Sequence, residues 1–357
     1  MRRLLGVVVC VVLLLGGLSL AAAGGGGGGA SAAGASSPSQ TQAQIQAREQ
    51  EIRIAGQFGL VYAPLMVAQK NKIFEKYGLK PVWKEYGSGA AVREALVSGE
   101  VDVGFMGIPP FLIGWDKGCP WKAAVGFCVV PVGLVTNNPS IKSLKDFKPG
   151  DKIAVPSPGS VQHILLAMQA EKELGSATAF EKHIVAMPHP DAAAALISKK
   201  GIAAHFTTPP YMFEELSHPG MHLVVDDVAC FGQPFSFNVG VATTRFHDGN
   251  PVAYACFVMA ISEAMAWINV NKKEAAALLA PEFGLTPDKT YRYLTWPGMD
   301  YTTAPYGLMG FADFMRKAGY IRNVPRSIED IAWENLVAFI GDRAGEQSPI
   351  QQLQFRR

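Results

Sequence analysis

The sequence lacks most of the patterns that mark nucleic-acid-binding proteins, metalloenzymes and hydrolases. Its 32 basic and 30 acidic residues leave a formal net charge of +2 with no long block of one sign, so nothing indicates a nucleic-acid partner. The G-x-S-x-G, H-E-x-x-H, C-x-x-C and Walker A patterns are absent, and seven histidines are scattered without ligand spacing. We therefore expect no catalytic residue of these classes, no metal and no cofactor.

Cysteine is also scarce. After Cys10, which lies too early in an apolar run for a lipid-attachment site, the chain has Cys119, Cys128, Cys230 and Cys256. An extended segment would hold Cys119 and Cys128 about 25–30 Å apart, so we do not expect these two to pair. We favour buried, unpaired thiols and leave disulfides among the others open, because an exported chain is permitted to form them.

The N-terminus has the layout of a secretory signal. A basic head, an apolar run and an A-x-A sequence fill residues 1–23, and no basic stop-transfer cluster follows. We expect cleavage and a periplasmic location; a retained membrane anchor is the alternative. Residues 24–50 are rich in Gly, Ser and Gln and are expected to be a flexible linker, and the polar residues 341–357 a disordered tail. About 300 residues remain, which favours two lobes.

Strand and helix patterns alternate from Glu51 onward, which predicts an α/β protein built from parallel βαβ units. The expected strands are 51–56, 79–86, 101–107, 152–155, 183–188, 202–206 and 223–227; the expected helices are 63–78, 88–99, 160–175, 190–201 and 209–220.

The C-terminal third predicts a return to the first lobe. Residues 121–138 and 234–246 have extended patterns, and we expect the chain to cross between lobes near Asn137 and Asn238. The apolar run 250–271 contains Ser262 and Glu263 and is expected to be a buried core helix, not a membrane span. The predicted boundaries are 51–136 and 236–340 for lobe 1 and 137–235 for lobe 2.

Two strand-to-helix corners share one construction. Ser88-Gly89 and Gly159-Ser160 each place a glycine and a hydroxyl where a helix begins, one in each α/β block. Helix starts carry unpaired N–H groups and the positive end of the helix dipole, and small residues let an anion approach them. Each corner alone is explained as an ordinary N-cap. Together they predict a cleft that holds one ligand from both sides.

A third corner follows the strand at 202–206. We expect a helix to start after Thr208, with Pro209 as its first residue, and Thr207 and Thr208 to point their hydroxyls at the cleft. His205 is interpreted either as a hydrogen-bonding group of the cleft or as a core-edge histidine bonded to backbone.

The remaining expected wall residues follow the strands of the first block. Gln57 and Phe58 come after the first strand, and Met106 and Gly107 after the third. Residues 87–92, GSGAAV, match a dinucleotide fingerprint in part, but Val92 replaces its third glycine, so this does not predict a nucleotide cofactor.

The order of these segments resembles the ABC-transporter solute-binding proteins of the nitrate/sulfonate/taurine (NMT1/THI5-like) family. The resemblance runs from Ile52 to Phe339 and is carried by APLMVAQKNKIFEKYGL (63–79), YGSGAAVREALVSGEVDVGFMG (86–107), SIKSLKDFKPGDKIAVPSPGSVQHILL (140–166) and PHPDAAAALISKKGIAAHF (188–206). It implies a type II periplasmic-binding fold, in which two Rossmann-like lobes joined by a two-strand hinge close over one small molecule.

The same resemblance implies contacts and partners. Ser88, Gly89, Ser160 and Gln57 match positions that commonly hold the ligand, and an ABC permease and ATPase are the expected partners of a monomer. The chain departs from the family at Ala203, where many members read Asp-Ala, and at 205–208, where His-Phe-Thr-Thr replaces an aromatic followed by proline.

These observations predict binding and not catalysis. We expect a small anionic organic solute of the sulfonate, taurine, nitrate or carboxylate class. The alternative is a pyrimidine or thiamine-precursor-like compound stacked on Phe58, Phe206 or Tyr211. A pyrimidine-synthase-like enzyme is disfavoured because its cysteine cluster is missing, and a sensor lobe would need a separate signalling partner.

Overall fold

The computed structural model describes residues 50–341. These residues belong to one compact unit. The signal peptide (1–23), nearly all of the linker (24–50) and the tail from residue 342 fall outside the described residues, so the predictions for them stay predictions.

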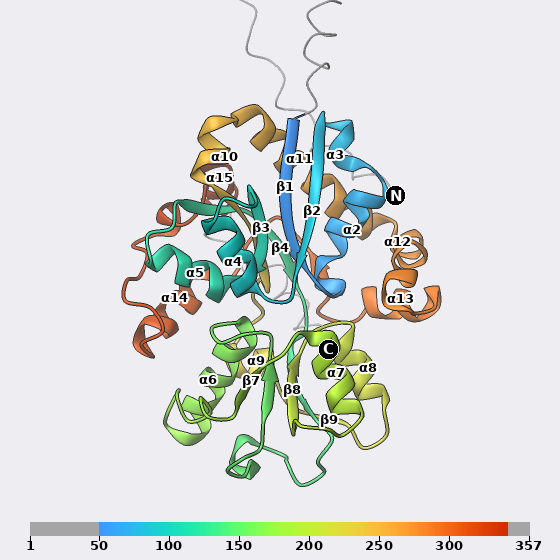
Figure 1. Ribbon diagram of the computed structural model, residues 1–357, viewed down its shortest axis with the longest axis vertical. Coiled ribbons are helices and arrows are strands. Elements are labelled where there is room, and N and C mark those ends of the chain that lie inside the picture. The colour runs from blue at the N-terminus through green and yellow to red at the C-terminus, as the bar shows by residue number, and fades with distance from the viewer. Residues whose placement is uncertain (1–49, 342–357) are drawn as a thin grey trace, which may run out of the picture. The chain divides into compact units, whose positions relative to one another are not determined.

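Two β-sheets organise the described residues (Figure 1). The first has six strands in the order β11-β4-β10-β3-β1-β2, and the second has five in the order β7-β6-β8-β5-β9. We call the half built on the first sheet lobe 1 and the other half lobe 2. The strands are β1 (Gln50–Gln57), β2 (Leu79–Tyr86), β3 (Val103–Gly107), β4 (Trp121–Val129), β5 (Gly133–Thr136), β6 (Ile153–Val155), β7 (Ile184–Ala186), β8 (Ala204–Thr207), β9 (His222–Asp226), β10 (Asn238–Thr243) and β11 (Asp300–Tyr301).

Helices cover the sheets and connect the parallel strands (Figure 1). In lobe 2 they are α6 (Val161–Leu174), α7 (His189–Ile197), α8 (Tyr211–Ser217) and α9 (Asp227–Phe231), with the short 3₁₀ turn η2 (Leu144–Asp146). The others are α2 (Ala63–Lys70), α3 (Ile73–Lys76), α4 (Gly89–Val97), α5 (Ile108–Asp116), α10 (Thr244–Gly249), α11 (Pro251–Val270), α12 (Lys272–Leu279), α13 (Pro287–Leu294), α14 (Leu308–Lys317) and α15 (Glu334–Gly341), with η1 (Leu60–Tyr62), η3 (Ala280–Phe283) and η4 (Ile328–Asp330).

The two sheets share a topology. In each, three parallel strands are followed by one antiparallel strand that arrives from the other part of the chain: β10 beside β3, and β5 beside β8. The carboxyl ends of the parallel strands therefore lead into α4, α5, α6 and α7, where ligands bind in folds of this kind.

One predicted boundary is wrong. The sequence predicts that lobe 1 extends to residue 136, but β5 (Gly133–Thr136) pairs with β8 and β9 of the second sheet. The first crossing is therefore the short segment 130–132 and not Asn137, because Gly133–Thr136 finds its hydrogen-bond partners in lobe 2. The return crossing precedes β10, which starts at Asn238.

Two helix predictions also need correction, and some helices were not predicted. The helix expected over 63–78 is broken into α2 and α3 at Lys72, whose φ of 50° is left-handed. α8 begins at Tyr211 after Pro210, so Thr208 does not cap it. α5 and α13 were not predicted: α5 opens with two prolines, and α13 lies in a segment whose polar residues give little apolar periodicity.

The apolar segment 250–271 folds as α11. By length and composition this helix could cross a membrane. In the structure, however, it packs on α2 and α3, and Tyr77 donates a hydrogen bond to Glu263 at 2.9 Å. This agrees with the prediction of a core helix. The four described cysteines are free, as expected, with Cys128 and Cys230 buried.

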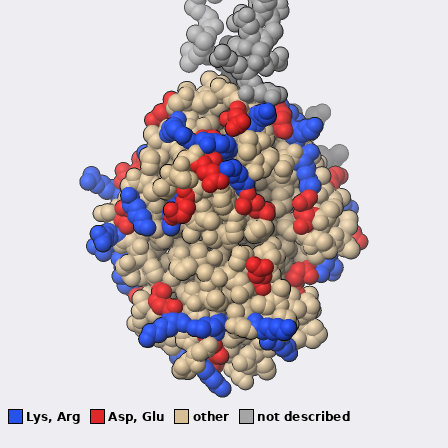
Figure 2. Space-filling model, viewed as in Figure 1, with Lys and Arg blue, Asp and Glu red and all other residues tan. Residues whose placement is uncertain are grey.

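Charged side chains of both signs are interspersed over the face shown in Figure 2. This distribution matches the near-balanced composition, with 32 basic and 30 acidic residues. A mixed surface of this kind favours solubility and gives no strong long-range field for a polyanion.

Candidate functional site

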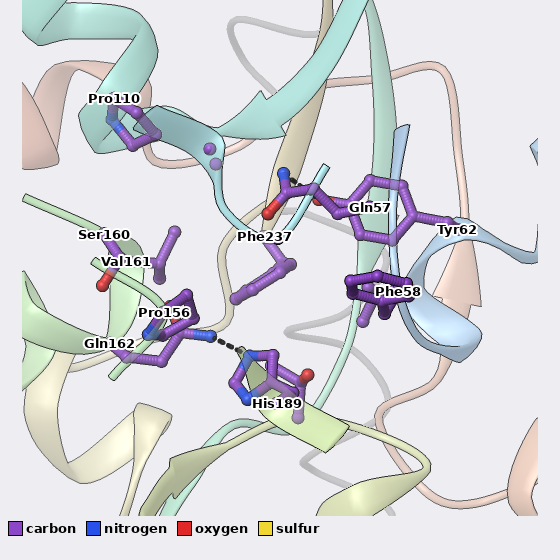
Figure 3. Close-up of a pocket in the computed structure, with 15 residues that line it drawn as sticks. Gln57, Phe58, Tyr62, Pro110, Pro156, Ser160, Val161, Gln162, His189 and Phe237 are labelled. Carbon is purple, nitrogen blue, oxygen red and sulfur yellow. Dashed lines mark hydrogen bonds between the residues drawn. The ribbon is translucent and has the colours of Figure 1, made fainter. Parts of the chain in front are cut away.

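A small cavity lies between the lobes (Figure 3) and leaves about 20 Å³ of free space. The fit between the lobes is tight: a methyl group on Gly107 of lobe 1 would overlap Val161 of lobe 2. The cavity is lined by residues from both sheets: Gln57, Phe58, Val61, Tyr62, Gly87, Gly89, Gly107, Pro110, Pro156, Ser160, Val161, Gln162, His189, Thr208 and Phe237. The two lobes are therefore in close contact around a cavity to which both contribute residues.

Two helix N-termini open on this cavity. Ser160 caps α6, accepting a hydrogen bond from the backbone N–H of His163 at 3.3 Å, and Ser88 caps α4, accepting from Ala91 at 3.3 Å. Ser160 and Gly89 line the cavity. The N-cap function of both serines is thus visible, and the remaining free N–H groups of these helix starts supply a positive potential without a charged side chain.

Six of the eleven predicted site residues line the cavity and five do not. The six are Gln57, Phe58, Gly89, Gly107, Ser160 and Thr208; the five are Ser88, Met106, Gly159, His205 and Thr207. Alternation along the strands explains part of this division, since Met106 and Thr207 precede Gly107 and Thr208 and point the other way. The backbone N–H of Gly159 donates to His163 Nδ1 at 2.8 Å.

The wall from lobe 1 is largely aromatic. The side-chain amide of Gln57 donates to the Tyr62 hydroxyl at 2.6 Å (Figure 3). It also donates to the backbone carbonyl of Phe105 at 3.2 Å. Phe58 and Tyr62 lie beside it, and burial raises the pKa of Tyr62 well above its usual value. The amide oxygen of Gln57 is therefore left as the acceptor of this wall.

The wall from lobe 2 ends in a chain of buried polar groups. Gln162 Nε2 lies 2.9 Å from His189 Nε2 (Figure 3), His189 Nδ1 lies 2.8 Å from His205 Nε2, and His205 Nδ1 lies 2.6 Å from Glu215 Oε1. His205 is fully buried, and its partners are side chains. It is thus neither a lining residue nor bonded to backbone, which corrects both interpretations made from the sequence.

Burial controls the protonation of this chain. It raises the pKa of Glu215 to about 9, lowers that of His205 to about 3 and lowers that of His189 well below its usual value. All three groups are therefore neutral near pH 7.

The lining residues that sequence reasoning missed include Tyr62, Gln162, His189 and Phe237. His189 does carry a signal, because it follows β7 and opens α7, a strand-to-helix corner like those that were recognised. Gln162 sits in the first turn of α6, two residues after Ser160.

The hydroxyl of Thr208 is buried and has no hydrogen-bond partner among the described residues. Such an orphan donor costs free energy in a folded chain unless something fills the site. In addition, no lysine, arginine, aspartate or glutamate lines the cavity within residues 50–341. A cationic guest would find no counter-charge here.

A second, larger groove of about 910 Å³ runs beside the crossing segments. It is lined mainly by apolar residues such as Val130, Met212 and Trp296, together with Asp226 and Asp227. It has neither the paired helix starts nor the orphan hydroxyl, so the cavity between the sheets is the better candidate site.

The comparisons with known proteins agree with this architecture. The model of the NMT1-like family matches residues 46–281. The chain belongs to the NMT1-like family. A protein of Bacillus subtilis (strain 168) named as an aliphatic sulfonates-binding protein is 27% identical over 236 residues, which cover 64% of this chain and 68% of that protein.

Solved structures of similar fold include other solute-binding proteins. The alkanesulfonate-binding protein SsuA from Xanthomonas axonopodis pv. citri, bound to MOPS, has a TM-score of 0.66 at 19% identity and covers 80% of this chain and 99% of its own. The periplasmic nitrate-binding protein NrtA from Synechocystis PCC 6803 has a TM-score of 0.68 at 17% identity and covers 85% and 91%. The predicted two-lobed periplasmic-binding fold is confirmed.

Membership of the NMT1-like family confirms the resemblance drawn from the sequence, that of an ABC-transporter solute-binding protein of the nitrate/sulfonate group. The relatives are named as binding proteins and not as enzymes.

Proposed function

We propose that this chain is the exported substrate-binding protein of an ABC importer and captures a small anionic organic solute by closing its lobes. The guest is of the sulfonate, taurine, nitrate or carboxylate class, and the closed protein delivers it to a membrane permease driven by an ATPase. The basic and apolar N-terminus supports export to the periplasm. The printed names of the Bacillus subtilis relative and of the two structurally similar binding proteins support the class of guest.

One observation carries this proposal: the starts of α4 and α6 meet at a cavity lined by no charged side chain among the described residues. Helix starts attract anions through their N–H groups and dipoles. The orphan hydroxyl of Thr208 and the hydroxyl of Ser160 are further donors at the same place. A site with donors and without carboxylates selects an anion or a neutral molecule over a cation.

Lobe closure follows from the position of the site. A guest that contacts Gln57 and Gly107 on one side and Ser160 and Thr208 on the other stabilises the closed form, because it interacts with both lobes only there. We propose that the six predicted residues that line the cavity contact the guest: Gln57, Phe58, Gly89, Gly107, Ser160 and Thr208.

Isothermal titration of the purified, signal-free protein tests the proposal. The probes are ethanesulfonate, taurine, nitrate and benzoate, with an uncharged aminopyrimidine and a tetraalkylammonium ion as contrasts. We expect at least one anion to bind with a micromolar or lower Kd, and the cation not to bind. Binding of the uncharged heterocycle alone would contradict the helix-start argument.

That heterocycle represents the second candidate. The rings of Phe58, Tyr62 and Phe237 line the cavity and offer apolar faces to a flat guest. Two rings expected for this alternative are placed differently, since Phe206 is fully buried outside the lining and Tyr211 stacks on His189 with centroids 5.8 Å apart. Quenching of tryptophan fluorescence over the same probes separates the two candidates.

A further inference from the structure

Gln162, His189, His205 and Glu215 form one continuous hydrogen-bonded chain that begins at the cleft and ends in the core of lobe 2. Its three links measure 2.9, 2.8 and 2.6 Å. Gln162 and His189 line the cavity, and His205 and Glu215 are fully buried behind them. Each group in the chain is both a possible donor and a possible acceptor, so every link depends on the next.

Two proton arrangements satisfy all three links. In one, Gln162 donates to His189, His189 Nδ1–H donates to His205, and His205 Nδ1–H donates to the Glu215 carboxyl. In the other, every donor is reversed: the Glu215 O–H donates to His205 Nδ1, His205 Nε2–H donates to His189 Nδ1, and His189 Nε2–H donates to the Gln162 amide oxygen. Half a turn of the Gln162 amide exchanges its oxygen and nitrogen, so both arrangements fit the same geometry.

The surroundings of Glu215 select between them. Its Oε2 atom is buried and has no hydrogen-bond partner in the described part of the chain, and among the same residues the neighbouring Lys289 pairs with Glu214 and not with Glu215. The first arrangement requires either an ionised carboxylate with one bare oxygen or a protonated Oε2 with nothing to receive its hydrogen. The second arrangement requires neither, because the carboxyl proton stays on Oε1 and is donated in a hydrogen bond to His205 Nδ1.

Protonation equilibria agree with the second arrangement. Burial raises the pKa of the Glu215 carboxyl to about 9 and lowers that of His205 to about 3, so an acid facing a neutral imidazole is the stable pair at pH 7.

We propose that Glu215, His205 and His189 form a relay of fixed direction that turns the N–H₂ group of Gln162 toward the cleft, where it donates to an acceptor oxygen of the guest. The proposal rests on the function proposed above for the same cavity. In it, Glu215 and His205 are positioning residues that act through Gln162. The lobe 2 wall then consists of donors: the Gln162 amide, the Thr208 hydroxyl and the start of α6. This matches a guest whose charge is carried by oxygen atoms, such as a sulfonate or carboxylate.

The direction of the relay is measured on the unmodified protein, without any guest. Long-range ¹H–¹⁵N NMR of histidine-labelled protein at pH 7 distinguishes ring tautomers. We expect His189 and His205 both to carry their hydrogen on Nε2, with Nδ1 unprotonated. Both hydrogens on Nδ1, or a charged imidazolium at either residue, would overturn the proposal.

The link to the guest is measured with a matched pair of variants, Glu215→Gln and Glu215→Met. They are similar in size, but only the glutamine can donate to His205. With ethanesulfonate, taurine, nitrate and benzoate as probes, we expect Glu215→Gln to bind within about threefold of the unmodified chain and Glu215→Met at least tenfold more weakly, which is about 1.4 kcal/mol.

Failure of this proposal and failure of the proposed function are distinguishable. If the unmodified chain binds an anion and Glu215→Met binds it equally well, the relay has no part in binding and only this proposal falls. If the unmodified chain binds none of the probes, the proposed function falls, and the proposal, which rests on it, falls with it even if the tautomers are as expected. Circular dichroism confirms that each variant is folded, and should Glu215→Met not fold, the tautomers decide.

Discussion

The two walls of the cleft each present a glutamine, but they hold it by different means. Gln57 of lobe 1 is bonded to the Phe105 carbonyl, which can only accept, and to the Tyr62 hydroxyl. Its amide therefore has one possible orientation, with the oxygen left over. Gln162 of lobe 2 is bonded to a histidine, which can donate or accept, and its orientation depends on groups as far away as Glu215.

The difference shows how one residue type gives opposite chemistry. A backbone carbonyl is a fixed acceptor at every pH, so the Gln57 side of the lobe 1 wall presents an acceptor oxygen and flat aromatic faces, apart from the N–H groups at the start of α4. A chain of titratable groups has a direction that burial must impose, so lobe 2 presents donors only while Glu215 keeps its proton. The guest is thus oriented, with its acceptor oxygens toward the lobe 2 donors and the start of α4 and away from the Gln57 oxygen.

The largest expected effect is on the pH dependence of the free energy of unfolding, which Glu215 behind the lobe 2 wall controls and Gln57 in the lobe 1 wall does not. Because burial raises the pKa of Glu215 to about 9 from 4.5, its contribution to stability is complete below pH 4.5 and is lost as the pH rises toward 9. Glu215→Gln removes this loss. We expect its free energy of unfolding, relative to the unmodified chain, to rise by up to about 1.4 kcal/mol per pH unit between pH 5 and 9.

Urea unfolding at pH 5, 7 and 9 measures this difference. Gln57→Met is the control from the other wall and should leave the pH dependence unchanged, since no titratable chain stands behind it. Burial also raises the pKa of Asp227 to about 7, so its contribution to the free energy of unfolding also falls as the pH rises. This change is the same in both proteins and cancels in the comparison. Parallel curves for Glu215→Gln and the unmodified chain would show that Glu215 is ionised in the fold.

The next largest expected effect is a loss of guest affinity when a side chain prevents the two lobes from closing fully. Gly107→Ala places a methyl group against Val161 across the cleft. Overpacking of this kind costs about 1–3 kcal/mol, and here it opposes the closed form, so guest affinity should fall by roughly 5- to 150-fold. Gly249→Ala is the control, because nothing lies within 4 Å of its new methyl group. Titration of both variants with the tightest anion checks this, and equal affinities would contradict the close contact of the lobes.

The smallest effect compares two neighbouring threonines of lobe 2. Thr207 and Thr208 both have buried hydroxyls without partners in the structure as described, but only Thr208 lines the cavity. Thr208→Val should weaken guest binding by up to about tenfold, the value of one hydrogen bond, and Thr207→Val should leave it unchanged. Isothermal titration measures both affinities, and equal affinities for the two variants would mean that the Thr208 hydroxyl makes no specific contact with the guest.

The sequence could predict the features that depend on neighbouring residues, and it could not predict those that depend on contacts between distant segments. Ser88 and Ser160 were found because capping is local: a hydroxyl, a glycine and the start of an apolar period lie within a few residues. The alternating strands and helices of both sheets follow from equally local patterns. β5 was misplaced because its pattern marks a strand but says nothing about which sheet completes its hydrogen bonds.

Long-range contacts account for most of the missed site. His189 and Gln162 are 27 residues apart, and His205 meets Glu215 across ten residues, so no periodicity links them. Lys72 breaks a helix whose apolar spacing continues through it, and the sequence pattern gives no sign of the left-handed backbone at this residue. The relay exists only because the fold brings together α6, α7, β8 and α8, which carry its four residues.

A crystal structure of the protein with its tightest-binding anion tests the central claim most directly. The account predicts that the oxygens of the anionic group lie within hydrogen-bond distance of lobe 2 donors at Ser160, Gln162 or Thr208, while the rest of the molecule faces Phe58 and Tyr62. An anion seated in the groove beside the crossing segments, or one whose charged group faces Gln57 and contacts neither helix start, would contradict it.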